Sequence, residues 1–150
     1  MLMKRLAIFI TSSLILLEGI TACSSKGSKY PIVMPVDGEV HISTALVNDG
    51  NTHFFTFQLG DKYINFFART DATGKVLTHF DACYSCYRYK EGYVQEGREV
   101  VCTACQIGFK LDQEEWDWVG PCVPVTLQSK VKDGVLVITE KKLELGAKLF

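Results

Sequence analysis

The sequence predicts a mostly β protein: a small β-rich domain with an embedded four-cysteine metal ribbon, after an N-terminal lipoprotein signal peptide. Three observations support this fold class. Several short segments alternate apolar with polar residues or are rich in aromatic residues, and turn residues such as Gly, Asn and Asp separate them. Two Cys-x-x-Cys pairs lie among these segments. Beyond the first 22 residues, no segment has a sustained helical repeat of apolar residues.

The composition is that of an ordinary globular protein. A chain of 150 residues allows one domain with a hydrophobic core. Charged residues make up 22% and hydrophobic residues 47% of the chain, and the net charge is −1 with acids and bases interspersed. A nucleic-acid-binding domain needs a basic face, which this balance does not provide. We therefore expect no nucleic-acid partner.

The N-terminus has the pattern of a bacterial lipoprotein signal peptide. Lys4 and Arg5 are followed by an apolar stretch that Glu18 interrupts before it could span a bilayer of about 30 Å. The stretch leads to Ile20-Thr21-Ala22-Cys23, which resembles a lipobox. Cys23 would then carry the acyl chains, and more than one chain gives stable anchoring. A plain signal peptide with a chance cysteine is the alternative.

These features divide the chain into three parts. We expect residues 1–22 to be a cleaved signal peptide, residues 23–30 a lipidated tether and residues 31–150 the folded domain. The tether is small and polar, so it has nothing to bury. The protein is therefore expected in the bacterial cell envelope, anchored to a membrane by lipid and facing the periplasm or the exterior.

The β pattern predicts the order of the strands. Alternating or aromatic-rich segments predict strands at residues 39–47, 53–59, 62–69 and 75–80, the last leading into the first cysteine pair. Residues 92–98 predict a strand, a turn and a second strand, and residues 107–111 lead away from the second pair. Residues 125–130 and 135–139 predict a final hairpin. Residues 113–118 and 143–150 leave helix or loop open.

The two cysteine pairs predict a metal site. Cys83 and Cys86 form the first pair, Cys102 and Cys105 form the second, and fifteen residues separate the pairs. A two-residue gap lets both sulfurs of a pair point at one centre, and the spacer is long enough to bring the second turn over the first. Four such ligands suit Zn²⁺, iron or an iron–sulfur cluster. The spacing therefore predicts a metal without identifying it.

The fifth thiol and the chemistry of the group leave alternatives open. Cys122 is either an auxiliary ligand or a small buried core residue. Structural disulfides would suit an oxidising compartment, but acylation of Cys23 would leave an odd number of thiols. Disulfides within Cys-x-x-Cys are usually redox-active rather than structural, so a thiol–disulfide oxidoreductase is another possibility. We favour metal binding.

Structural roles are expected for the residues beside the cysteines. We expect His79 on the surface at a strand edge rather than as a ligand, and Asp81 as a cap of the first cysteine turn. Trp116 and Trp118 are expected in the core, with a partner-docking patch as the alternative. Four tyrosines near the first pair are expected to serve in packing, with shielding of the centre from water as the alternative: Tyr84, Tyr87, Tyr89 and Tyr93.

Other site classes lack their signatures. A covalently attached c-type haem requires Cys-x-x-Cys-His, whereas Tyr87 and Gln106 follow the two pairs. The β-rich pattern lacks the βαβ context of thioredoxin-like sites, and the sequence has neither a phosphate-binding glycine-rich loop nor a nucleophile elbow. We therefore expect no catalytic residue and a non-catalytic metal-binding protein.

A longer pattern resembles a known family. It consists of Phe80-Asp81-Ala82-Cys83-x-x-Cys86, Gly92-Tyr93-x-Gln95-Glu96-Gly97, Val101-Cys102-x-x-Cys105 and Cys122-x-Pro124. Over roughly residues 52–140 the chain resembles the FtrD-like family of membrane iron–sulfur-containing proteins. Many members carry transmembrane helices before this domain, which we do not expect here. Members usually have Gly after the fourth cysteine, where this chain has Gln106.

The resemblance implies a function. It implies an iron–sulfur cluster or iron held by Cys83, Cys86, Cys102 and Cys105, with Cys122 auxiliary, used in electron transfer or iron handling. The implied partners are an iron permease or components that oxidise ferrous iron in a membrane iron-uptake system. The alternatives are a zinc- or disulfide-stapled binding module of an envelope complex and the thiol–disulfide oxidoreductase named above.

Overall fold

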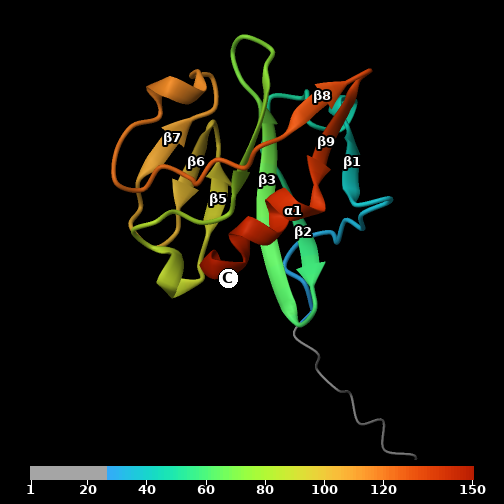
Figure 1. The fold of residues 1–150 in the computed structure, drawn as a ribbon. Helices are drawn as coiled ribbons and strands as arrows, with labels where there is room; N and C mark the ends of the chain where they lie inside the picture. The colour runs from blue at the N-terminus through green and yellow to red at the C-terminus, as the bar shows by residue number, and fades with distance from the viewer. Residues whose placement is uncertain (1–26) are drawn as a thin grey trace, which may run out of the picture.

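The computed structural model describes residues 27–150, so the expected signal peptide and Cys23 lie outside the described residues. The described chain is mostly β, as predicted, and its strands form three small antiparallel sheets (Figure 1). Residues 27–150 include one short α-helix, α1 (Glu140–Glu144). None of their helices is long and apolar enough to cross a membrane.

The central sheet contains the aromatic-rich strands, in the order β2-β3-β4. These are β2 (His53–Leu59), β3 (Lys62–Thr70) and β4 (Val76–Phe80), as predicted. The turn between β2 and β3 is Gly60-Asp61. Side chains of a strand alternate between its faces, and both faces of β3 are buried. Phe66 packs into one hydrophobic cluster and Phe67 into another.

A second sheet covers one face of the central sheet, in the order β1-β9-β8. It contains β1 (Glu39–Ser43), β8 (Lys130–Lys132) and β9 (Val135–Thr139). The strand predicted over residues 39–47 ends four residues early, and Thr44–Leu46 form a 3-10 helix. This turn shifts the alternation, so Leu46 is 51% exposed and Val47 is fully buried.

The prediction that residues 125–130 form a hairpin with residues 135–139 is wrong for most of this segment. Only Lys130–Lys132 pair with β9. Upstream, the N–H of Leu127 donates to the carbonyl of Thr78 and the N–H of Phe80 donates to the carbonyl of Val125, both on the free edge of β4. The segment therefore links the central sheet to the second sheet, a long-range pairing that local sequence does not reveal.

The third sheet carries the second cysteine pair, in the order β5-β6-β7. It contains β5 (Tyr93–Glu96), β6 (Glu99–Cys102) and β7 (Gly108–Lys110), in agreement with the predicted strands, with the bend at Gly97. The open prediction at residues 113–118 resolves as a single 3-10 turn, Glu115–Asp117.

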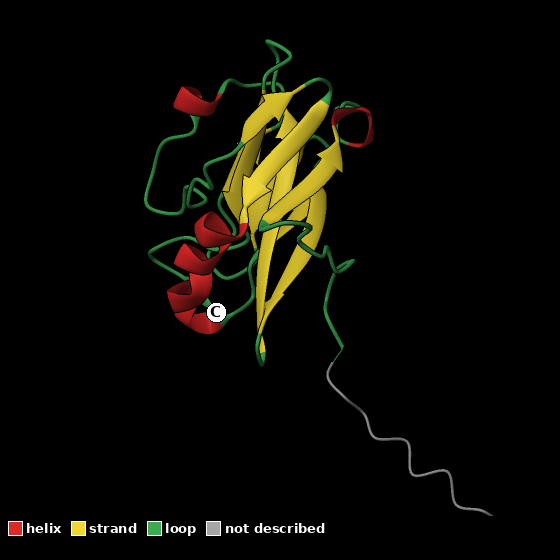
Figure 2. Cartoon of the chain, turned by 45° about the vertical axis from the view of Figure 1, so that its right-hand side comes forward, coloured by secondary structure: helices red, strands yellow, loops and turns green. Residues whose placement is uncertain are grey.

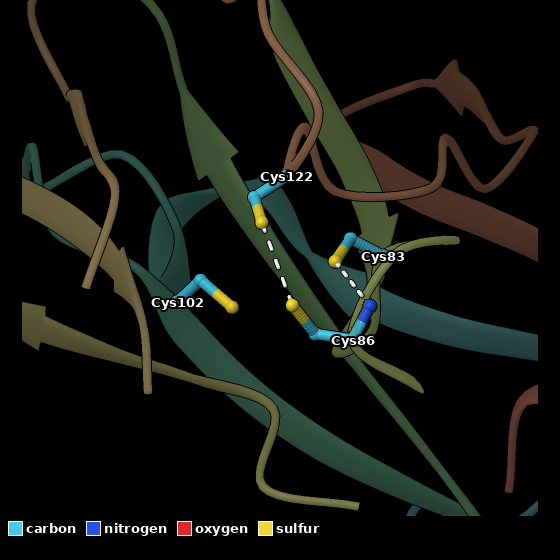
Figure 3. A group of neighbouring side chains, drawn as sticks. All are labelled: Cys83, Cys86, Cys102 and Cys122. Carbon is cyan, nitrogen blue, oxygen red and sulfur yellow. Dashed lines mark hydrogen bonds between the residues drawn. The ribbon is translucent and has the colours of Figure 1, made fainter. Parts of the chain in front are cut away.

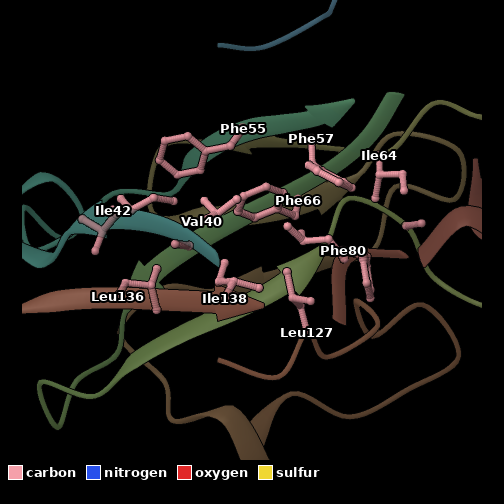
Figure 4. Close-up of a cluster of buried hydrophobic side chains, with 14 of the residues drawn as sticks. Val40, Ile42, Phe55, Phe57, Ile64, Phe66, Phe80, Leu127, Leu136 and Ile138 are labelled. Atoms are coloured by element: carbon pink, nitrogen blue, oxygen red, sulfur yellow. The ribbon is translucent and has the colours of Figure 1, made fainter. Parts of the chain in front are cut away.

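Two hydrophobic cores share the central sheet. The first lies between the central and second sheets and includes Phe57, Phe66, Leu136 and Ile138 (Figure 4). Helix α1 and the 3-10 helix Leu145–Leu149 pack along one side of the strands (Figure 2). The second core lies on the opposite face and contains three of the cysteines as buried members. The candidate site is thus built into a core.

Candidate metal centre

Four cysteines from three separate segments converge in the second core (Figure 3). The sulfurs of Cys83, Cys86, Cys102 and Cys122 all lie within 4.8 Å of one another. Cys83 and Cys86 follow β4, Cys102 ends β6, and Cys122 comes from the loop after the 3-10 turn at Glu115–Asp117. The group therefore depends on tertiary packing as well as on local spacing.

The first cysteine turn presents backbone N–H groups to its own sulfur. The N–H of Cys86 donates to the sulfur of Cys83 at 3.2 Å, and the N–H of Tyr87 donates to the carbonyl of Cys83 at 3.0 Å. These bonds close the turn and place two sulfurs on one side of it. Cys83 is buried and Cys86 is partly exposed.

The second cysteine turn shows how Gln106 fits where family members usually have glycine. This residue has φ +60, in the left-handed region that glycine adopts at no steric cost. Its N–H donates to the carbonyl of Cys102 at 2.8 Å, and its side-chain amide donates to the carbonyl of Thr103 at 2.7 Å. The backbone therefore takes the glycine-like conformation at this position with a different residue.

Cys122 is held in place by its carbonyl group. The hydroxyl of Tyr93 donates to this carbonyl, and the hydroxyl of Ser85 donates to the carbonyl of Pro121 at 2.6 Å. The sulfur of Cys122 lies 3.5 Å from that of Cys86. Cys122 is buried, and its thiol belongs to the group of four.

Cys105 occupies a different position from the other four. It is partly exposed, and its sulfur is not among the four that all lie within 4.8 Å of one another. Its thiol nevertheless interacts with those of Cys122, Cys102 and Cys86. The structure therefore gathers all five predicted thiols, and the assignment of Cys83, Cys86, Cys102 and Cys105 as the ligands stays a prediction.

Burial and hydrogen bonding shift the thiol pKa values in opposite directions. Burial raises the pKa of Cys102 to about 12 and also raises that of Cys122. At Cys83 burial acts the same way, but hydrogen bonds from the N–H groups of Cys86 and Ser85 help to outweigh it, and the pKa of Cys83 is lowered. Several buried thiolates together need a cation, which a bound metal supplies.

The donor set fits a thiolate-bound metal. Metal–sulfur bonds of about 2.3 Å in a tetrahedron place neighbouring sulfurs about 3.8 Å apart. The observed separations, up to 4.8 Å, are close to this value. The five cysteines of the described chain are free thiols. The group can therefore bind iron or zinc with little rearrangement.

Asp81 supports the site from outside the first turn, so the prediction that it caps that turn is wrong. Its carboxylate accepts the N–H of Tyr93 at 2.6 Å and the hydroxyl of Tyr30 at 3.2 Å. Burial raises the pKa of Asp81 to about 7. Gly92, with φ +69, makes room for this carboxylate, because a Cβ there would lie 2.4 Å from it. No sequence signal identified this bond, because it joins separate segments.

The start of the described chain packs beside this carboxylate. The ring of Tyr30 stacks on Phe54 with centroids 4.9 Å apart. The ammonium of Lys29 lies 4.0 Å from Asp81 and donates to the carbonyl of Glu91 at 3.2 Å. Residues 29 and 30 therefore form a strap on the domain, next to the first cysteine turn.

Aromatic rings separate the thiols from the rest of the sheet. Phe67 contacts Tyr93, with centroids 5.9 Å apart, and stacks with His79 at 5.3 Å. His79 also stacks with Trp118, so the prediction of a surface histidine is wrong: this residue is 1% exposed. Tyr93 and Trp118 are buried, as predicted, whereas Trp116 is 67% exposed, so the prediction that it lies in the core is wrong. Tyr84, Tyr87 and Tyr89 are also exposed.

The comparisons with known proteins give one match. The family model described as membrane iron-sulfur containing protein FtrD-like matches residues 47–150. No curated protein and no solved structure matches the chain. The matched span contains all five cysteines of the site together with Asp81 and Tyr93.

Proposed function

Because the chain belongs to the FtrD-like family of membrane iron-sulfur containing proteins, we propose that it is an envelope lipoprotein whose thiolates hold an iron centre for electron transfer or iron handling. The observation that carries the proposal is the convergence of four cysteine sulfurs within 4.8 Å. The partner would be a membrane iron-uptake system, in the form of an iron permease or components that oxidise ferrous iron.

The burial of the group suits an iron centre that exchanges electrons. Bound iron would supply a one-electron couple between its ferric and ferrous states. Cys83, Cys102 and Cys122 are buried, whereas Cys86 reaches the surface. The buried side, closed by Tyr93 and Phe67, limits access of water. The exposed side would leave a short path to a partner.

The family is one of membrane proteins, and we propose that a lipid on Cys23 provides the attachment. Five residues lie between this cysteine and Lys29, where the described strap begins. Mass spectrometry of protein extracted from bacterial membranes should find acyl chains on Cys23. Cys23→Ser should release the protein from the membrane, and an unmodified Cys23 in membrane-bound protein would contradict the proposal.

Metal analysis tests the iron centre. The full chain is purified in detergent without oxygen, and iron, zinc and visible absorption are measured. Iron with thiolate-to-iron charge-transfer bands is expected, and Cys83→Ser should abolish the bands. A colourless protein with zinc would contradict electron transfer. The same thiol geometry would then serve the alternative, a zinc-stapled binding module, since zinc also takes four thiolates in a tetrahedron.

Thiol counting tests the remaining alternative. A thiol–disulfide oxidoreductase would be isolated without metal, with some of its cysteines oxidised, and would catalyse exchange with a model disulfide. The iron protein is expected to lack this exchange activity while loaded with metal, because its thiolates are coordinated. If the metal-free protein catalyses thiol–disulfide exchange at a rate similar to that of known oxidoreductases, the oxidoreductase is favoured.

A further inference from the structure

The thiols are packed too closely for a centre with several irons. In a cluster, sulfide ions bridge the irons and each thiolate points outward from its own iron, so thiolates on different irons are separated by roughly 6 Å. Here the sulfurs of Cys83, Cys86, Cys102 and Cys122 are all within 4.8 Å of one another, and those of Cys86 and Cys122 are 3.5 Å apart. A single tetrahedral ion requires about 3.8 Å.

The packing around the thiols supports the same conclusion. Cys83, Cys102 and Cys122 are buried in the second core together with Tyr93. Two or more irons with their bridging sulfides would have to displace the ring of Tyr93 or the backbone of the cysteine turns. Tyr93 is fixed at both ends, by Asp81 and by the carbonyl of Cys122.

We propose that the centre is one metal ion coordinated by Cys83, Cys86, Cys102 and Cys122, and that Cys105 lies outside its coordination sphere. The proposal rests on the proposed function for the identity of the metal as iron. Cys105 follows Cys102 at the spacing of a ligand pair, and its thiol interacts with those of Cys122, Cys102 and Cys86. Cys122, and not Cys105, belongs to the set of four sulfurs that all lie within 4.8 Å of one another. Cys105 is then a partly exposed thiol beside the ion.

The stoichiometry of the full-length protein tests the single ion. After purification in detergent without oxygen, we expect one iron per chain and no acid-labile sulfide. X-ray absorption should show iron–sulfur scattering at about 2.3 Å and no iron–iron scattering. Two or more irons per chain with matching sulfide would overturn this proposal and leave the proposed function standing. One zinc per chain would support the single ion and overturn the proposed function in electron transfer.

Alkylation of the native protein tests the ligand set without any substitution. With the metal bound, iodoacetamide should modify Cys105 and leave the other four site cysteines unmodified, as mapped by mass spectrometry. Modification of Cys122 with protection of Cys105 would overturn the assignment. Removal of the metal should expose all five thiols to the reagent.

A matched pair of variants gives a second test. Cys105→Ser should keep one iron per chain and an unchanged visible spectrum. Cys122→Ser should lose most of the iron, because it removes a ligand and not only a buried side chain. Cys122→Ala and Cys105→Ala provide the same comparison with an apolar replacement. Iron loss in the Cys105 variants with retention in the Cys122 variants would contradict the proposal.

Discussion

Tyr93 links the candidate site to the sheet below it. Its N–H donates to Asp81, its hydroxyl donates to the carbonyl of Cys122, and its ring contacts Phe67. One residue thus connects the first cysteine turn, the loop that carries Cys122 and strand β3. Gly92, directly before it, allows the close approach of Asp81.

Gly92→Ala should destabilise the protein more than another glycine with the same backbone conformation. The new Cβ would lie 2.4 Å from the carboxylate of Asp81, which two hydrogen bonds hold in a buried position. We expect a loss of about 2–4 kcal/mol in the free energy of unfolding, measured with urea. Gly97→Ala is the control: its φ is +58 and no atom lies within 4 Å of the new Cβ.

The control isolates the contact with Asp81 from the cost of a left-handed backbone. Gly97→Ala should lose only about 1 kcal/mol, the typical cost of placing alanine in this region. Equal losses in the two variants would show that the close approach of Asp81 does not constrain the site.

His79 should make stability depend on pH. Burial lowers the pKa of His79 to about 3, helped by the nearby charges of Arg69 and Lys75, whereas the unfolded chain titrates near about 6.5. Between these values the unfolded state binds more protons, so the contribution of His79 is complete above pH 6.5 and is lost as the pH falls toward 3. The complete loss amounts to roughly 5 kcal/mol.

The variant His79→Phe tests this dependence. Phenylalanine keeps the stack with Phe67 and Trp118 and removes the buried Nδ1, which has no hydrogen-bond partner among the described residues. The free energy of unfolding is measured from pH 4 to 7 for both proteins. As the pH falls, the variant should become more stable relative to wild type. Because Asp81 acts in the opposite direction in both proteins, the difference between the curves is the quantity to compare. Parallel curves would contradict the prediction.

At the scale of elements, the C-terminal helices close the first core. Leu143 of α1 and Leu149 of the next turn are buried there, whereas Leu145 between them is 60% exposed. Lys62 donates to the carbonyls of Ala147 and Phe150 and so caps the chain end. These helices thereby cover the side of the first core.

Leu143→Ala should cost about 2–5 kcal/mol in the free energy of unfolding, since it leaves a cavity in a fully buried site. Leu145→Ala, in the adjoining turn, should change it by less than about 0.5 kcal/mol. Urea unfolding followed by circular dichroism measures both. Similar values for the two leucines would show that the helices are not docked as described.

Local patterns predicted elements but not their partners. Strands β2, β3 and β4 were recognisable because their aromatic residues and turns are adjacent in sequence. Helix α1 has only five residues, too few to show a helical repeat. The pairing of residues 125–127 with β4 and the arrival of Cys122 beside Cys86 depend on contacts between distant segments. Spacing therefore predicted a thiol site, while tertiary packing selected which four thiols are mutually close.

At the scale of the molecule, two cores lie on opposite faces of one sheet and differ in what holds them together. The first core is aliphatic and aromatic, whereas the second contains the cysteines. The third sheet, which pairs with neither of the others, depends on the second core. A bound metal would therefore stabilise one part of the protein more than the other.

Metal removal should loosen the third sheet selectively. With a chelator, hydrogen exchange of β5, β6 and β7 should rise strongly, because binding of a structural metal contributes to folding. Exchange in β1 and β9 should change little, since none of the five cysteines within residues 27–150 packs into their core. Hydrogen-exchange mass spectrometry distinguishes these regions. A uniform rise across all sheets would show that the two cores unfold as one unit.

The strap formed by Lys29 and Tyr30 has a consequence for encounter with a partner. If Cys23 carries lipid, the six residues to Lys29 extend at most roughly 20 Å. The thiol site beside the strap would then move in a thin layer over the bilayer and search a plane instead of a volume. A partner in the same membrane could thus exchange electrons through a complex too weak to detect between the separated proteins.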